Sequence, residues 1–160
     1  MLCEANLPTS WRARPRGFIA LMGLYESNYL RLRALAGDLM ALAGARHSLV
    51  GGDCELVLAV KERTPYTSVL ELSYLLPPAE APQRAAGSRG ASGKAAATLP
   101  LLERYPQLRL RLYHDARLLE AEGSERELHH RWRRNLMLNK WLEYCSDRGH
   151  RFTPALPVTG

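Results

Sequence analysis

The alternation of apolar and polar positions in residues 108–113 predicts the strand on which the rest of the fold is built. The side chains alternate in the order Leu108, Arg109, Leu110, Arg111, Leu112 and Tyr113. A period of two is typical of a strand with one buried face and one face in water. Residues 118–122 carry a shorter pattern of the same kind, so we expect them to fold back beside this strand.

Three further strands are predicted upstream, at residues 47–50, 54–62 and 67–75. They are separated by the sequences Gly51–Asp53 and Arg63–Tyr66, which contain the Gly, Asp, Thr and Pro residues that turns require. Because these connections are short and contain no crossover helix, consecutive strands are expected to pair antiparallel.

A helix is predicted over residues 16–36, where Leu21, Tyr25 and Tyr29 recur at helical spacing and Gly37 marks the end. Asp38 is expected to cap a short helical stretch at residues 39–43.

A second long helix is predicted over residues 125–148, opened by Ser124 and Glu127 as a capping box and ended by Gly149. Residues 99–105 are interpreted as one helical turn before Pro106. The buried stripe of the long helix is expected to consist of Leu138, Trp141, Leu142 and Cys145.

The fold class that follows is α+β: an antiparallel meander of four to five strands packed against an N-terminal and a C-terminal helix. The helices are expected to cover one face of the sheet. The other face is expected to be exposed to water and to carry Glu55, Lys61, Arg109 and Arg111.

Residues 16–150 are predicted to form a single domain. Residues 1–15 are interpreted as a disordered basic tail, residues 77–98 as a disordered loop rich in Ala, Gly, Ser and Pro, and residues 151–160 as an extended C-terminal tail. The packed part begins near Met22, which is an alternative start of the chain.

The chain has 160 residues, a formal net charge of +6 and three cysteines. The positive charge favours acidic partners but does not distinguish among RNA, DNA, lipid headgroups and proteins.

The cysteines show no paired spacing, which predicts reduced thiols in a cytoplasmic protein and no zinc ribbon. The apolar run at residues 18–22 is too short to cross a membrane. No cofactor motif is present, so neither a cofactor nor a metal site is expected.

The densest charge cluster is predicted in the C-terminal helix, at Arg131, Arg133 and Arg134 around Trp132. Guanidinium groups bind phosphates and carboxylates, and an indole can stack on a base, so this cluster is a candidate contact for nucleic acid or an acidic protein. The alternative is an ordinary solvated helix face.

The sequence Tyr113-His114-Asp115 invites a catalytic interpretation, with His114 as a general base. However, neighbouring strand residues point to opposite faces, so Asp115 cannot simply orient His114, and a hydrogen-bonded structural histidine is favoured. The turn at residues 62–67 presents Glu62, Arg63 and Tyr66 as a candidate ligand-binding rim. Turn chemistry with one exposed ion pair is the alternative there.

Two functional hypotheses remain. The favoured one is a non-enzymatic binding or adaptor protein with a basic surface, because no nucleophile elbow, phosphate-binding loop or metalloprotease motif occurs. The alternative is a small hydrolase or ligand-binding enzyme using His114, Glu62 and Tyr66, which requires these three side chains to converge on a pocket. A homodimer through an exposed sheet edge is a further possibility.

Four stretches resemble the YqiB-like family, a set of small bacterial proteins classed as a domain of unknown function. They are residues 24–29 (LYESNY), 62–67 (ERTPYT), 111–116 (RLYHDA) and the stretch from Asn135 to Gly149 with its WLEYC sequence. The resemblance implies a cytosolic bacterial protein and brings no established activity, cofactor or catalytic residue. The chain departs from the family in its basic tail before Met22 and in its long Ala/Gly/Ser loop.

Overall fold

The computed structural model describes residues 17–76 and 103–152 of the chain. Two long helices, one short 3₁₀ helix and five strands occupy these residues. In chain order they are α1 (Phe18–Ala36), η1 (Leu39–Ala41), β1 (Ala45–Ser48), β2 (Glu55–Arg63), β3 (Thr67–Leu76), β4 (Glu103–Tyr113), β5 (Leu118–Ala121) and α2 (Leu128–Asp147).

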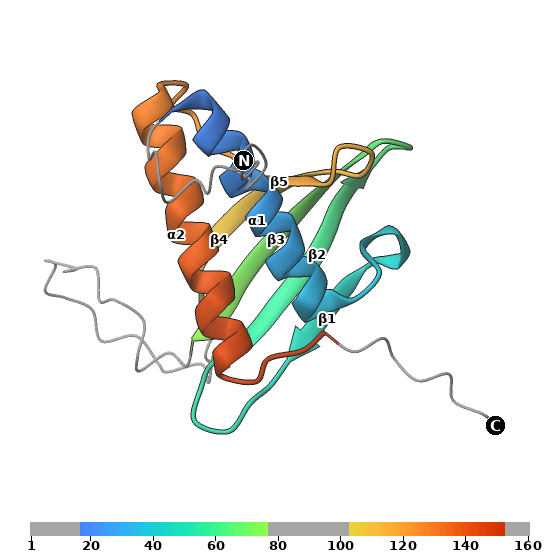
Figure 1. Ribbon diagram of the computed structural model, residues 1–160. Helices are drawn as coiled ribbons and strands as arrows, with labels where there is room; N and C mark the ends of the chain where they lie inside the picture. Colours follow the sequence, from blue (N-terminus) through green and yellow to red (C-terminus); the bar gives the residue numbers. More distant parts are fainter. Residues whose placement is uncertain (1–16, 77–102, 153–160) are drawn as a thin grey trace, which may run out of the picture.

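The five strands form one sheet in the order β1-β2-β3-β4-β5, and every neighbouring pair is antiparallel. Helices α1 and α2 lie side by side across one face of this sheet (Figure 1). The predicted α+β class, with an antiparallel meander and two covering helices, is therefore confirmed. No helix in the described residues is long and apolar enough to cross a membrane.

The leucines of the alternating pattern form the core between sheet and helices. Leu110 and Leu112 of β4 are fully buried and pair in register with Leu70 and Ser68 of β3. The helices add Leu32 and other aliphatic side chains to the same cluster. The period-two pattern therefore assigned the buried face of β4 correctly.

The opposite sheet face is less exposed than the sequence predicts. Its charged residues include Lys61 and Glu71, which form an ion pair at 3.6 Å. Val57 and Val69, however, are only 1% and 3% exposed on this face. The expectation of a wholly water-exposed face is corrected to a face on which charged and buried apolar positions alternate.

Strand β4 begins earlier than predicted. Residues 103–105 belong to the strand and not to a helical turn. Pro106 lies where the β3–β4 register shifts between Ser73 and Leu75. A bulge tolerates a residue without a backbone donor, because the ladder is locally interrupted there. This explains how a proline is accommodated inside a strand of the sheet.

Helix α2 begins later than predicted. Its N-cap is Glu127, which makes no side-chain capping hydrogen bond, so the predicted capping box of Ser124 and Glu127 does not form. The prediction at Asp38 is confirmed, because its carboxylate accepts the N–H of Met40 at 3.0 Å and caps η1.

The folded unit extends beyond residue 150. Phe152 is 2% exposed, and its N–H donates to the carbonyl of Leu35 at 2.8 Å. Residues 151 and 152 therefore belong to the folded unit and not to a C-terminal tail, because the phenyl ring of Phe152 is buried and its N–H is bonded to α1. The predictions for residues 1–15, for the loop at 77–98 and for residues 153–160 lie outside the described residues.

The two edges of the sheet differ. In β5 two of the outward backbone groups are bonded by helix side chains: Asn135 accepts the N–H of Ala121, and Asn28 donates to the carbonyl of Leu119. At β1, the backbone pairing with β2 directs the N–H and C=O groups of Ala45 and His47 to the open side. Of the two edges, β1 is therefore the more open to pairing.

Candidate functional site: an arginine-lined cavity

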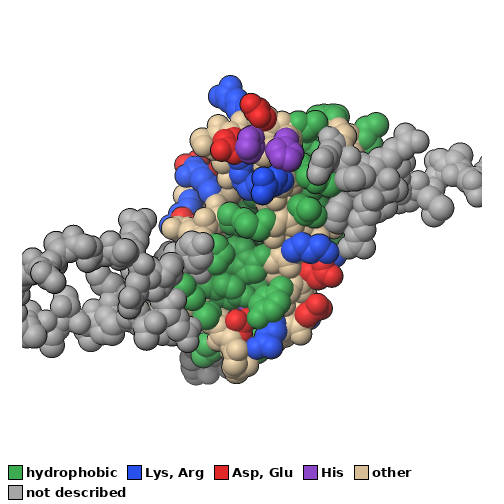
Figure 2. Space-filling view, turned by 90° about the vertical axis from the view of Figure 1, so that its left-hand side faces the viewer, with side chains coloured by type: hydrophobic (Ala, Val, Ile, Leu, Met, Phe, Trp, Pro, Cys, Tyr) green, Lys and Arg blue, Asp and Glu red, His purple; other side chains and the backbone are tan. Residues whose placement is uncertain are grey.

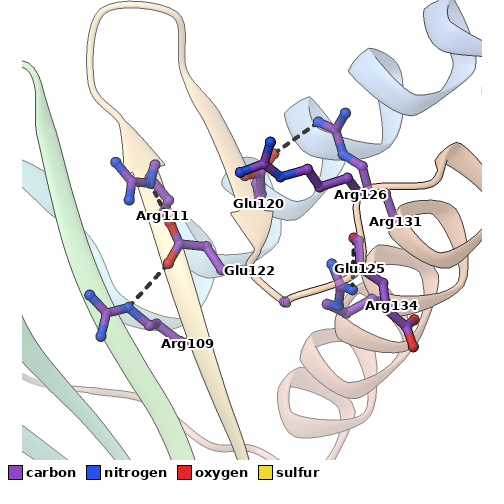
Figure 3. Close-up of a pocket in the computed structure, with 9 residues that line it drawn as sticks. Arg109, Arg111, Glu120, Glu122, Glu125, Arg126, Arg131 and Arg134 are labelled. Carbon is purple, nitrogen blue, oxygen red and sulfur yellow. Dashed lines mark hydrogen bonds and ion pairs between the residues drawn. The ribbon is translucent and has the colours of Figure 1, made fainter.

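A cavity of about 640 Å³ opens where β4 and β5 meet the N-terminal part of α2. We call it the arginine cavity, because arginines from three elements converge on it (Figure 3). Its lining consists of Arg109, Arg111, Glu120, Glu122, Gly123, Glu125, Arg126, Arg131 and Arg134.

The strand side of the cavity follows from the alternation in β4. Leu110 points into the core, so Arg109 and Arg111 point to the outer face of the sheet. Both guanidinium groups contact the carboxylate of Glu122: Arg109 Nε lies 3.1 Å from Oε2, and Arg111 Nε binds Oε1. Arg109 also lies 3.3 Å from the carboxylate of Glu62.

The inner wall of the cavity is a charged network linked to α1. Arg131 Nη2 donates to the hydroxyl of Tyr25 at 3.0 Å and lies 3.4 Å from Glu120 Oε2. Burial raises the pKa of the Tyr25 hydroxyl to about 12, and the neighbouring Glu120 carboxylate adds to that shift. Tyr25 is therefore a neutral hydrogen-bonding support for Arg131 across the physiological pH range.

The remaining arginines are Arg134, which lies in α2 against the link between β5 and α2, and Arg126, which lies in that link. A Cβ atom at Gly123 would overlap the guanidinium of Arg134, so only glycine lets this side chain lie across the link. Arg134 also donates to the carbonyl of Glu125 at 3.4 Å. Arg126 is exposed and makes no hydrogen bond or ion pair within residues 17–76 and 103–152.

Positive charge exceeds negative charge in the lining. Five arginines face three glutamates, which leaves a formal surplus of two positive charges. Guanidinium groups form bidentate, charge-assisted hydrogen bonds with carboxylates and phosphates. The arrangement is thus suited to binding an anionic group, with Arg126 and Arg134 as the lining arginines that form no ion pair with a described carboxylate.

The structure separates the residues of the predicted helix cluster. Arg131 and Arg134 line the cavity, whereas Arg133 is exposed on another side of α2. Trp132 is 5% exposed and packs with Leu21 and other residues of α1. The predicted stacking role of Trp132 is wrong, because its indole is buried between the two helices and cannot contact a base.

Arg63 has a structural role instead of the predicted binding role. Its guanidinium donates to the carbonyl of Leu42 at 2.6 Å and to the carbonyl of Met40. These bonds hold the segment after η1 against the end of β2. The donors of Arg63 are therefore engaged by backbone oxygens.

The residues of the alternative enzyme hypothesis do not converge. His114 lies on the core side of the sheet, where its Nε2 is 2.8 Å from the hydroxyl of Ser68. Glu62 contacts Arg109 on the outer face, and Tyr66 is 66% exposed. Asp115 is exposed in the β4–β5 turn. The pocket that this hypothesis requires at His114, Glu62 and Tyr66 is not formed, because the strand alternation places two of them on opposite faces.

The pKa of His114 is lowered from its ordinary value by burial and by the positive charge of Arg63, while Asp115 opposes the shift. Together with the Ser68 contact, this describes a neutral imidazole that joins β3 to the end of β4. The structure thus agrees with the interpretation of His114 as a hydrogen-bonded histidine.

A second histidine site was missed by sequence reasoning. His150 is fully buried; its Nδ1 lies 2.9 Å from Ser48 Oγ, and its Nε2 lies 2.9 Å from Asp53 Oδ2. The Ser48 oxygen also accepts the N–H of Arg151 at 3.0 Å. The side chains resemble a hydrolytic triad in type, but Ser48 is 5% exposed, so no substrate reaches it. They fasten the segment after α2 to β1 and the following turn.

Figure 2 shows the side of the molecule on which α2 lies. Hydrophobic side chains gather in the middle of this face, and positive and negative side chains alternate around them. Met137 and Tyr144 of α2 are 49% and 48% exposed. This side is thus mixed in character and is not a continuous basic stripe.

Comparisons with protein-family models, curated proteins and solved structures give no match to this chain. Among the described residues, no group of three or more His, Cys, Asp or Glu side chains is arranged to hold a metal ion. The chemistry of the site is therefore argued from its own geometry.

Proposed function

We propose that this protein is a non-enzymatic binding or adaptor protein that docks an acidic segment of a partner protein in the arginine cavity. The observation that carries the proposal is the convergence of five arginines and three glutamates on one concave site. A carboxylate of the partner would reach Arg126, and the surplus charge of the cavity favours it electrostatically.

The mixed lining favours a protein over a nucleic acid. A duplex or single strand presents phosphates at every nucleotide, and Glu120, Glu122 and Glu125 would repel them. Binding of single strands also relies on aromatic stacking, for which Trp132 is not accessible. A protein segment can instead place acidic side chains opposite arginines and basic ones opposite glutamates.

The proposal is tested with a labelled oligoglutamate peptide, whose binding is followed by fluorescence anisotropy at low and at physiological ionic strength. Wild-type protein is expected to bind, and added salt is expected to weaken the complex. Arg126→Glu is expected to weaken binding about tenfold, because it reverses a charge at the opening of the cavity. Since Arg126 makes no described contact, this variant is expected to fold normally.

Arg133→Glu is the matched control. It makes the same charge change on α2 at a residue that does not line the cavity, and we expect less than about a twofold effect. Equal losses in the two variants would show that binding follows overall charge and would overturn the cavity. Tighter binding of single-stranded RNA of equal charge, lost in Arg126→Glu, would assign the site to nucleic acid instead.

The native partner would be sought by affinity capture from cytosolic extract, with wild type and Arg126→Glu as baits and with nuclease treatment. A protein retained by wild type after nuclease, and lost with Arg126→Glu, would support the proposal.

We further propose that the chain is a cytoplasmic member of the YqiB-like family. Two of the stretches that support this lie at RLYHDA, in β4 and its turn, and at WLEYC, in α2.

A further inference from the structure

A second cavity, of about 380 Å³, lies between the C-terminal end of α1 and the turn that joins β4 to β5. Segments far apart in sequence form it, and it shares no lining residue with the arginine cavity. Its lining consists of Tyr29, Arg33, Gly37, Asp38, Leu39 and Arg117.

Arg117 has an unusual backbone. Its φ is 54°, and it is the only non-glycine residue with positive φ among residues 17–76 and 103–152. This left-handed conformation is unfavourable for a residue with a Cβ atom and is free of strain for glycine. The turn itself would therefore be served better by glycine. A strained residue whose side chain lines a cavity indicates that the side chain is needed there.

Positive charge exceeds negative charge in this lining as well, because Arg33 and Arg117 are accompanied by one carboxylate, that of Asp38. Neither Arg33 nor Arg117 makes an ion pair within the described parts of the chain. The nearby carboxylate of Asp38 instead accepts the N–H of Met40 at 3.0 Å. In the arginine cavity, by contrast, Arg109, Arg111 and Arg131 each contact a glutamate. Two guanidinium groups at one concave site thus retain their donors for an external anion.

We propose that the second cavity binds the phosphoryl group of a small phosphate monoester. Two guanidinium groups, one from α1 and one from the β4–β5 turn, match the several acceptor oxygens of a tetrahedral dianion, and Tyr29 belongs to the same lining. A volume of about 380 Å³ lies in the range of small-molecule sites. The organic part of the ester would occupy the part of the cavity that the phosphoryl group does not fill.

Isothermal titration calorimetry of the full chain with glycerol phosphate and with inorganic phosphate tests the proposal, with sulfate and chloride at matched ionic strength. Inorganic phosphate and sulfate, which are both tetrahedral oxyanions, are expected to bind more tightly than chloride, and the monoester is expected to bind more tightly than either because its organic part also contacts the cavity. Arg33→Gln and Arg117→Gly are each expected to weaken binding about tenfold. Equal binding of chloride would mean a nonspecific effect of anions, and a monoester that binds no more tightly than sulfate would mean a general oxyanion site; either result would overturn the proposal.

Arg117→Gly also separates binding from folding. Because glycine relieves the strain at this position, the variant is expected to melt at or above the wild-type temperature while its phosphate affinity falls. Arg126→Gln, in the arginine cavity, is the matched control and is expected to leave the affinity unchanged. Loss of binding in Arg126→Gln alone, or no binding in the wild type, would refute the second site.

Discussion

The side-chain oxygen of Asn135 accepts the backbone N–H of Ala121 at 2.7 Å, so a helix residue completes the hydrogen bonding of an edge strand. The side-chain amide of Asn28 donates to the carbonyl of Leu119 on the same strand, at 3.4 Å. Both asparagines are fully buried, and Asn139 connects to Asn28 at 3.0 Å. The three amides join α1, α2 and β5 through hydrogen bonds that no apolar residue could make.

We expect Asn135→Ala to reduce the free energy of unfolding by about 2–3 kcal/mol, because it leaves the buried N–H of Ala121 without a partner. Urea denaturation measures this change. Lys140→Ala is the control on the same helix; it removes only an exposed ion pair with Glu143 and is expected to change stability by less than about 1 kcal/mol. Equal effects of the two substitutions would contradict the assigned role of Asn135.

The imidazole of His114 is expected to titrate below 6.5, because burial and Arg63 lower its pKa. The folded protein then binds this proton less readily than the unfolded chain, so the contribution of His114 to stability falls as the pH drops through about 6.5. Replacing the exposed Asp115 with Asn should lower the pKa further. NMR titration of the ring protons measures both values, and a midpoint above 6.5 in the wild type would show that the assignment is wrong.

Asp53 is expected to make folding sensitive to acid. Burial alone would raise its pKa, but hydrogen bonds from His150 and from the N–H of Cys54 outweigh this and lower it from 3.8. The associated stability is present above that pH and is lost as the pH falls below it. Asp53→Asn should be less stable at neutral pH but lose less stability between neutral and acidic pH than wild type. Denaturation midpoints across the pH range measure this, and parallel curves would refute it.

Gly123→Ala is expected to change binding without unfolding the protein. The added methyl group displaces the guanidinium of Arg134, a flexible side chain, so stability should stay within about 1 kcal/mol of wild type. Oligoglutamate affinity should fall about threefold as one arginine leaves the cavity. Gly51→Ala is the matched control, since nothing lies within 4 Å of its Cβ position. Unchanged affinity in Gly123→Ala would exclude Arg134 from the binding site.

The sheet was predictable because its strands alternate leucine with charged or polar residues over short connections. The starts of β4 and α2 were not. The β4 prediction failed because Pro106 looks like the end of a helical turn until the bulge opposite it is seen. The α2 prediction failed because Ser124 and Glu127 have capping-box spacing, while the chain is still extended at Glu127.

The burial of Trp132 was hidden by the polar residues on its own helix face. Trp132, Asn135, Asn139 and Leu142 follow one another at helical spacing and are all buried. Because asparagines interrupt this stripe, the apolar pattern alone begins at Leu138. Their role depends on β5, whose unpaired edge becomes visible only when the strands are assembled.

The arginine cavity was found only in part by sequence reasoning. Arg131 and Arg134 stood out as a charge cluster, and the alternation placed Arg109 and Arg111 on the outer face of the sheet. No local pattern indicates that these two pairs, twenty or more positions apart, face the same space. The turn between β4 and β5 and the glycine at position 123 bring them together.

The unequal sheet edges limit how copies of this chain can assemble. A strand from another molecule can add beside Ala45 and His47, whereas at the far edge the carbonyl of Leu119 and the N–H of Ala121 are already bonded by Asn28 and Asn135. A strand arriving at β5 would have to displace these two amides, so strand addition is disfavoured there relative to β1. The polar contacts that tie the helices to β5 therefore also disfavour continuous growth of the native sheet from one molecule to the next.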